Sequence, residues 1–152
     1  MSNIKYSHTN LITTNWRRLS KFYTDVFGCV QTGPMRSLSG RHVEDGTNVR
    51  EPVIEGVHLL LPGYEADGPT LEIFQYGSVE DHVEKSANSK GYTHIAFEVS
   101  DMSEVCAKVV RGGGWMLGKL SRQPVKGVGI CTFIYVRDPD RNIIEIQSWE
   151  FL

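Results

Sequence analysis

The stretch YTHIAFEVS at residues 92–100 decides the fold of this chain, because an earlier stretch, YSHTNLITT at residues 6–14, has the same opening and the same period. Both stretches alternate in the way that is typical of a β-strand, and in both a His stands two residues after a Tyr. His8 and His94 therefore occupy matching positions on two predicted strands. A stretch that recurs in this way predicts two related halves in one chain.

Each of these strands has a later partner that carries one carboxylate among apolar residues. The first partner is TLEIFQY at residues 70–76, and the second is NIIEIQSW at residues 142–149. A carboxylate with apolar neighbours is costly to bury unless a charge or a metal compensates it. The repeat therefore predicts a divalent metal bound by two imidazoles and two carboxylates. These four residues are His8, Glu72, His94 and Glu145.

The two halves share one order of predicted elements. In the first half we expect a strand at 5–13, a helix at 16–28 and strands at 29–35, 53–61 and 71–76. In the second half we expect a strand at 92–99, a helix at 102–110 and strands at 115–120, 130–136 and 142–148. Module one is therefore placed at residues 4–76, the connector at 77–91 and module two at 92–149.

Two polar segments interrupt this pattern. Residues 36–52 contain glycine and many charges and have no sustained period, so we expect an exposed loop that could cover the site. This loop explains why the first half is longer than the second. The connector has room for a short helix.

Composition limits the kind of partner. A chain of 152 residues suits one domain or two tightly joined halves. The net charge is −2 with both signs interspersed, which predicts no binding to nucleic acid or to an anionic membrane. The sequence shows no secretion signal and no apolar run of about 20 residues. We therefore expect a soluble, cytoplasmic protein that binds a small molecule.

The three cysteines, Cys29, Cys106 and Cys131, are an odd number without a close pair. This spacing is not typical of a disulfide framework or of a cysteine zinc site. We expect free and mostly buried thiols.

With all four positions filled, the chain resembles the glyoxalase, or vicinal oxygen chelate (VOC), superfamily. The resemblance extends over residues 4–149 and includes FYTDVFG at residues 22–28 and YVRDPDRNIIEIQSW at residues 135–149. It implies an α+β fold in which two paired βαβββ modules form a cupped mixed sheet around a metal. It further implies a single VOC domain over residues 1–152 and a homodimer.

Within this superfamily the chain is most similar to glyoxalase I-like members. That similarity implies a lyase or isomerase in which Zn, Ni, Co or Mn stabilises an enediolate or enolate. A carboxylate at the metal, Glu72 or Glu145, would transfer the proton. The substrate would be a small molecule with vicinal oxygens.

Other members of the superfamily supply alternatives. Methylmalonyl-CoA epimerase-like members would use Glu145 as one base and a carboxylate in the stretch IEGVHLLLP at residues 54–62, here Glu55, as the second. Bleomycin-resistance proteins bind their drug without catalysis and lack the metal ligands. Extradiol dioxygenases bind iron through two His and one carboxylate, and the fourth ligand, Glu72, argues against this group. Fosfomycin-modifying enzymes are a more distant alternative.

Three further histidines complete the candidates. His58 stands in a predicted strand, where it could line the cup, with a core and a surface position equally compatible with the pattern. His42 and His82 stand in polar segments, and we expect both to be solvated.

Overall fold

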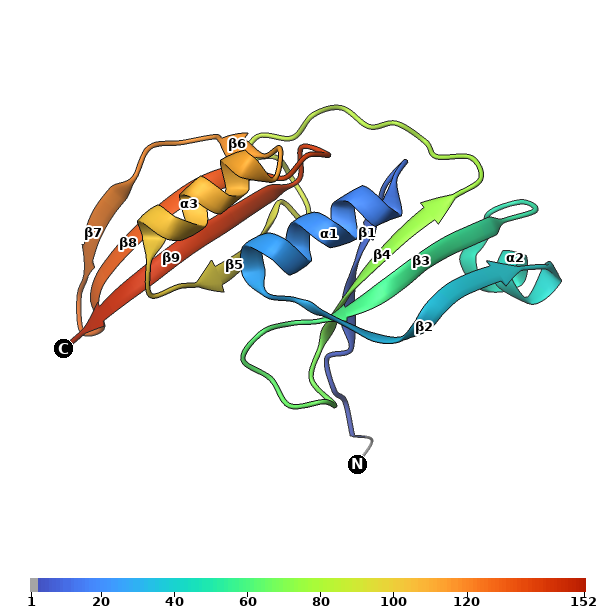
Figure 1. Ribbon diagram of the computed structural model, residues 1–152, viewed down its shortest axis with the longest axis horizontal. Coiled ribbons are helices and arrows are strands. Elements are labelled where there is room, and N and C mark those ends of the chain that lie inside the picture. Colours follow the sequence, from blue (N-terminus) through green and yellow to red (C-terminus); the bar gives the residue numbers. More distant parts are fainter. Residues whose placement is uncertain (1–2) are drawn as a thin grey trace. The chain divides into compact units, whose positions relative to one another are not determined.

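The computed structural model describes residues 3–152 and divides the chain into two compact units, each with its own mixed β-sheet (Figure 1). The first unit ends at Asp81, and the second is His82–Leu152. This boundary falls inside the predicted connector at residues 77–91, in which the structure has no helix.

The first unit contains a four-stranded sheet in the order β1-β4-β3-β2. Strands β1 and β4 are parallel, and the other neighbours are antiparallel. The elements are β1 His8–Ile12, α1 Trp16–Phe27, β2 Val30–Ser39, α2 Arg41–Thr47, β3 Val53–Leu60 and β4 Thr70–Tyr76.

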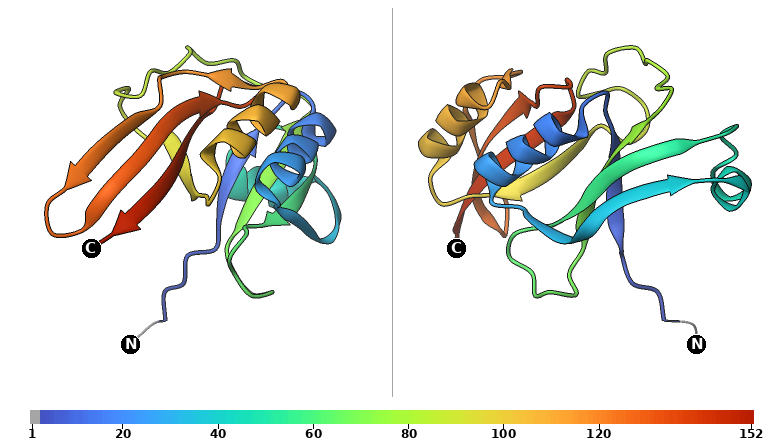
Figure 2. Two further views of the ribbon diagram at one scale, coloured as in Figure 1. Left: turned by 60° about the vertical axis from the view of Figure 1, so that its left-hand side comes forward. Right: turned by 45° about the vertical axis from the view of Figure 1, so that its right-hand side comes forward.

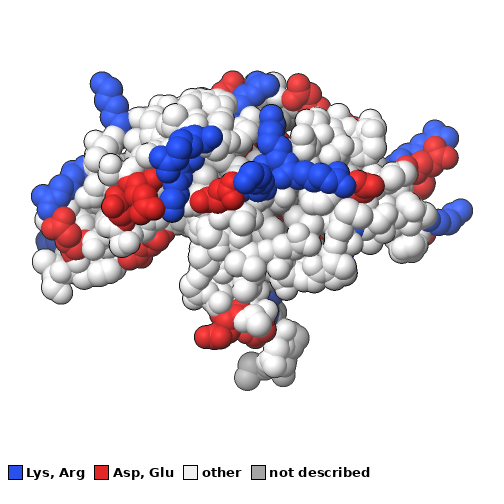
Figure 3. Space-filling view, viewed as in Figure 1, with Lys and Arg blue, Asp and Glu red and all other residues white. Residues whose placement is uncertain are grey.

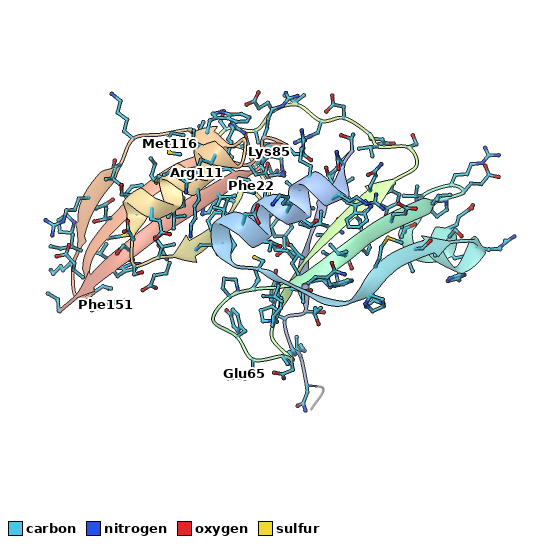
Figure 4. All side chains as sticks on the ribbon, in the orientation of Figure 1. Phe22, Glu65, Lys85, Arg111, Met116 and Phe151 are labelled. Atoms are coloured by element: carbon cyan, nitrogen blue, oxygen red, sulfur yellow. The ribbon has the colours of Figure 1, made fainter. Side chains whose placement is uncertain are left out.

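Helix α1 packs on one face of this sheet, against β3 and β4 (Figure 2). Asn15 caps its first turn, because the side chain accepts a hydrogen bond from the backbone N–H of Arg18 at 3.0 Å. Gly28 ends the helix in the left-handed conformation, with φ at 73°. The buried residues recur at helical spacing and form the core on this face. They are Trp16, Leu19, Phe22 (labelled in Figure 4), Tyr23, Val26 and Phe27.

Alternation along β4 decides which face carries its carboxylate. Leu71 and Ile73 are buried, with 1% and 0% of their surface exposed. Gln75, two residues further on, accepts a hydrogen bond from the backbone N–H of Trp16 at 3.4 Å, so this set of residues faces α1. Glu72 therefore points to the face that α1 does not cover.

The second unit repeats this plan with one more strand. Its sheet has the order β5-β9-β8-β6, and β7 also pairs with β8. Strands β5 and β9 are parallel, as β1 and β4 are. The elements are β5 His94–Glu98, α3 Met102–Arg111, β6 Trp115–Met116, β7 Ser121–Val125, β8 Gly129–Arg137 and β9 Ile143–Phe151.

Helix α3 contacts β9 in this unit. Asp101 caps the helix, since its side chain accepts a hydrogen bond from the backbone N–H of Glu104 at 2.8 Å. Ile144 and Ile146 of β9 are fully buried, as is Val109 of α3. Glu145 lies between the two isoleucines in sequence and therefore points to the opposite face.

Two buried charged residues, Arg137 and Asp138, organise the turn between β8 and β9. Asp138 accepts hydrogen bonds from the backbone N–H groups of Asp140 and Asn142 and from the Asn142 side chain. Arg137 donates to the backbone carbonyl groups of Arg141 and Lys85, at 2.5 and 2.6 Å. Lys85 is labelled in Figure 4. Satisfied buried polar groups of this kind hold the turn in one conformation.

The α+β class and the two βαβββ modules are confirmed, but some boundaries differ from the prediction. Residues 36–52 are not a loop, because β2 continues to Ser39 and α2 follows. Strand β2 lies at the edge of its sheet with all its residues exposed or half-buried, and α2 buries no residue. Neither element therefore has the apolar period that would predict it.

In the second unit the predicted strand at 115–120 is reduced to the two residues of β6, and β7 was missed. Strand β7 has the sequence SRQPV, with four exposed residues and a proline. Proline and polar residues are tolerated in such an exposed strand. The strand therefore lacks the alternation of apolar and polar residues by which a strand is predicted.

The charged groups on the surface are mixed in sign. On the face in Figure 3, Lys and Arg lie among Asp and Glu, without a wide patch of one sign. Exposed pairs such as Lys21–Asp25 and Glu104–Lys108 contribute to this mixture. Among residues 3–152, no helix has both the length and the apolar character that a membrane crossing requires.

The three cysteines are free, as predicted, and they should differ in reactivity. Burial raises the pKa of Cys29 to about 12, and it also raises the pKa of Cys106, which is only half-buried. At pH 8 the fraction of Cys29 thiolate is then about one in ten thousand. We expect iodoacetamide to alkylate Cys106 first and Cys29 only after unfolding, as measured by peptide mass spectrometry. Equal rates for these two thiols in the folded protein would contradict the buried position of Cys29.

Candidate metal centre

In the first unit, strand register brings four polar side chains to the face that α1 leaves open. Asn10 of β1 and His58 of β3 both lie opposite Glu72 of β4. His8 precedes Asn10 by two residues on β1 and lies opposite Thr70. Side chains of paired residues share a face, so these groups surround the carboxylate of Glu72.

Both oxygens of the Glu72 carboxylate have partners. His58 Nε2 lies 3.0 Å from Oε2, and Asn10 Nδ2 donates a hydrogen bond to Oε1 at 2.8 Å. His8 Nε2 is further away, 3.7 Å from Oε1. The Glu72 side chain is only 15% exposed, compared with 40% for His8. This carboxylate is therefore half-buried and held by neighbours of its own unit.

Burial changes the protonation of His58. Its pKa is lowered mainly by desolvation, and the charges of Arg36 and His8 lower it further, while Glu72 raises it. The net direction is downward from a starting value of 6.5. His58 is therefore mostly a neutral imidazole at pH 7.

The second unit repeats the register with different neighbours. Ala96 of β5 and Tyr135 of β8 both lie opposite Glu145, while His94 lies opposite Ile143. Ala96 thus has the place that Asn10 has in the first unit, and Tyr135 has the place of His58. This correspondence is residue for residue.

The pair in the second unit is in direct contact. His94 Nε2 lies 3.2 Å from Glu145 Oε2, and the side chains are 31% and 17% exposed. The ring of Tyr135 packs at 5.1 Å from the imidazole, measured between centroids. Burial, followed by the charge of Glu145, raises the pKa of Tyr135. The tyrosine therefore stays neutral beside this carboxylate.

Each predicted His presents the same nitrogen to its carboxylate. His8 Nδ1 lies 3.3 Å from Ser7 Oγ, and His94 Nδ1 lies 3.4 Å from Thr93 Oγ1. A partner at one ring nitrogen fixes the orientation of the ring and leaves the other nitrogen for a metal. Nitrogen and carboxylate donors in equal number also suit a borderline divalent ion. The donor types of these residues therefore suit such an ion.

The structure brings His8 near Glu72 and His94 near Glu145, each pair in its own unit. Within residues 3–152 it shows no group of three or more His, Cys, Asp or Glu side chains arranged to hold a metal. An open hollow of about 500 Å³ in the segment 39–53 contains none of the four residues.

Glu55, the second base expected for an epimerase-like enzyme, lies on the other face of β3. It pairs with Gln75, which faces α1, whereas His58 pairs with Glu72. This position removes the basis for a catalytic role of Glu55 beside Glu72. His42 and His82 are exposed, as expected.

Sequence reasoning left the position of His58 open and gave Asn10, on the same strand face as His8, no role at the site. Both contact Glu72 through strand register, which depends on how far each strand slides along its neighbour. Alternation alone places His58 on one of two faces and cannot choose its partner.

Comparisons with known proteins identify the fold and the family. Over 147 residues the chain is 28% identical to a probable lactoylglutathione lyase of Vibrio parahaemolyticus. The alignment covers 96% of this chain and 91% of the relative. Over 140 residues it is 30% identical to the lactoylglutathione lyase of Neisseria meningitidis, with 91% and 86% covered. A glyoxalase family protein of Bacillus cereus has the same fold, with a TM-score of 0.82, 14% identity and coverage of 98% and 96%. The family model of the Glyoxalase/Bleomycin resistance protein/Dioxygenase superfamily matches residues 5–146, and the chain belongs to this superfamily.

Proposed function

We propose that the chain is a glyoxalase I-like metalloenzyme, a lyase or isomerase that moves a proton on a carbon beside a carbonyl group. His8, Glu72, His94 and Glu145 would bind one divalent ion, Zn, Ni, Co or Mn, within one chain or across the two chains of a homodimer. The observation that carries this proposal is the repeat of a His–Glu pair at the same register in both units.

The relatives support the reaction class. The two curated relatives quoted above bear the name of one enzyme, lactoylglutathione lyase, and cover most of this chain. A pure binding protein of this superfamily would have no need for four filled ligand positions. The repeat and the relatives therefore point to the same class of reaction.

The chemistry of the site follows from its donors. A bound divalent ion would supply a Lewis acid for the vicinal oxygens of a substrate. The imidazoles of His8 and His94 would hold the ion, and Glu72 or Glu145 would accept the proton from carbon. Both carboxylates are at most 17% exposed, so bulk water would compete little for that proton.

The test is metal content combined with a proton-exchange screen. Protein purified without a chelating tag should contain stoichiometric divalent metal by elemental analysis. In deuterium oxide it should catalyse exchange on hemithioacetals more readily than on thioesters or 2-oxo acids, as measured by proton NMR. Exchange on thioesters alone would favour an epimerase-like enzyme. Protein without metal and without exchange would contradict the proposal and support a non-catalytic binding protein.

A further inference from the structure

The two glutamates of the repeat differ in how their own unit holds them. Glu72 has His58 at one oxygen and Asn10 at the other. Among the described residues, Glu145 makes a hydrogen-bond or ion-pair contact only with His94. The position of His58 is taken by Tyr135 in the second unit, and that of Asn10 by Ala96. The difference therefore lies in the neighbours and not in the backbone.

The contacts of His58 form a directed chain of hydrogen bonds. An ionised carboxylate only accepts hydrogen bonds, so His58 Nε2 donates to Glu72 Oε2 across 3.0 Å. In a neutral imidazole the other nitrogen then accepts. Thr70 Oγ1 lies 3.2 Å from His58 Nδ1 and can donate its hydroxyl proton there. A hydroxyl can donate or accept, so the acceptor-only carboxylate of Glu72 selects the Nε2–H tautomer of His58, and Thr70 holds the other ring nitrogen.

Packing prevents the imidazole from leaving this position. The His58 side chain is 18% exposed. The ring of Phe74 meets it edge to face at 5.8 Å between centroids, and the ring of His8 does so at 5.9 Å. Two aromatic rings in contact with a side chain restrict its rotamer. The hydrogen bond to Glu72 therefore comes from a fixed donor.

We propose that His58 is a positioning residue that orients the Glu72 carboxylate for metal binding, with Thr70 as the hydrogen-bond partner of its second ring nitrogen. This inference rests on the proposed function, because it assumes that Glu72 is a ligand. Partners of this kind orient a ligand and raise its affinity for the metal. Their loss typically lowers the metal affinity or the activity by about 10- to 100-fold.

The first experiment compares affinities for Zn²⁺ and Co²⁺ by competition with a chromophoric chelator. We expect His58→Leu to weaken binding by about 10- to 100-fold, because it removes the donor to Glu72. His58→Gln keeps an N–H donor and should lose less metal affinity. The affinity of Thr70→Val should lie between that of His58→Gln and that of the parent. His42→Leu, an exposed histidine of the same unit, is the matched control and should bind as the parent does.

A spectroscopic readout separates positioning from a general loss of structure. The visible spectrum of the Co²⁺-loaded protein reports ligand geometry, and it should change in His58→Leu and recover in His58→Gln. Circular dichroism confirms that each variant is folded. If His58→Leu failed to fold, His58→Gln and Thr70→Val would still test the donor and the contact at Nδ1.

The outcomes distinguish this inference from the proposed function. Parent-like affinity and spectrum in His58→Leu, together with loss of metal in His94→Ala, would overturn the role of His58 and leave the proposed function standing. A parent protein without metal affinity would overturn the proposed function. Long-range ¹H–¹⁵N NMR of the metal-free protein then decides the hydrogen-bond chain alone: the Nε2–H tautomer supports it, and the Nδ1–H tautomer overturns it.

Discussion

Replacing His94 with Ala is expected to remove bound metal from the protein. The imidazole is one of two nitrogen donors in the proposed site. Its loss should therefore lower the metal affinity by more than the factor of about 10 to 100 that is typical when a residue that only orients a ligand is lost. Glu72→Gln should also weaken binding, because it keeps the shape and removes the charge. Elemental analysis after equilibrium dialysis measures both effects.

These substitutions should leave the metal-free fold intact. The His94 side chain is 31% exposed, and Glu72 lies on the sheet face that α1 does not cover. Thermal unfolding without metal should therefore resemble that of the parent, while the stabilisation by added metal is lost. His42→Ala serves as the control for removal of a histidine. Full metal content in both His94→Ala and Glu72→Gln would show that the four-ligand site is wrong, and would favour the binding-protein alternative.

Much of the fold was predictable because its central elements have clear periods. The helix predicted at 16–28 is confirmed as α1, which has three features that a sequence can show, namely an apolar stripe, the cap residue Asn15 and the terminal Gly28. The strands that carry His8 and His94 were found from alternation, and their pairing with the glutamate strands follows the predicted repeat. These elements bury one face, and burial gives them a pattern that sequence reasoning detects.

The elements that were missed bury little. Strand β7, the second half of β2 and helix α2 consist mainly of exposed residues, so no alternation or stripe marks them. Helix α2 also contains Gly46, which lowers helix propensity. These elements form because they pair with a neighbouring strand or follow a local turn. The sequence of the segment alone shows neither of these causes.

The neighbours of the proposed ligands were harder to predict than the ligands. Alternation assigns His8 and Glu72 to faces, but it does not show that Glu72 lies opposite Asn10 and His58. That register depends on the turn at residues 61–69 and on the crossover through α1. A slide of two residues would keep every face and change every contact of the carboxylate.

Gly56→Ala is expected to be strongly destabilising, because the strand has no room for a methyl group at this position. A Cβ there would lie 2.0 Å from the carbonyl oxygen of Ile73 and 2.6 Å from Cδ1 of Phe74, whereas real Cβ contacts stay beyond 3.0 Å. Strand β3 lies between β2 and β4 and cannot move away without breaking hydrogen bonds on one side. The free energy of unfolding should fall by about 3 kcal/mol, the upper end of what overpacking costs.

The same substitution should also lower the metal affinity of the candidate site. The ring of Phe74 lies opposite Gly56 and packs against His58, so a displaced Phe74 would disturb the donor to Glu72. Urea unfolding measures the stability, and chelator competition measures the metal affinity of the folded fraction. The matched control is Gly46→Ala in α2, where nothing lies within 4 Å of the new Cβ. That change should be neutral or stabilising by about 0.5 kcal/mol, because it reduces the entropy of the unfolded chain. An unfolding midpoint for Gly56→Ala equal to that of the parent would contradict the close approach of β3 and β4 at this position.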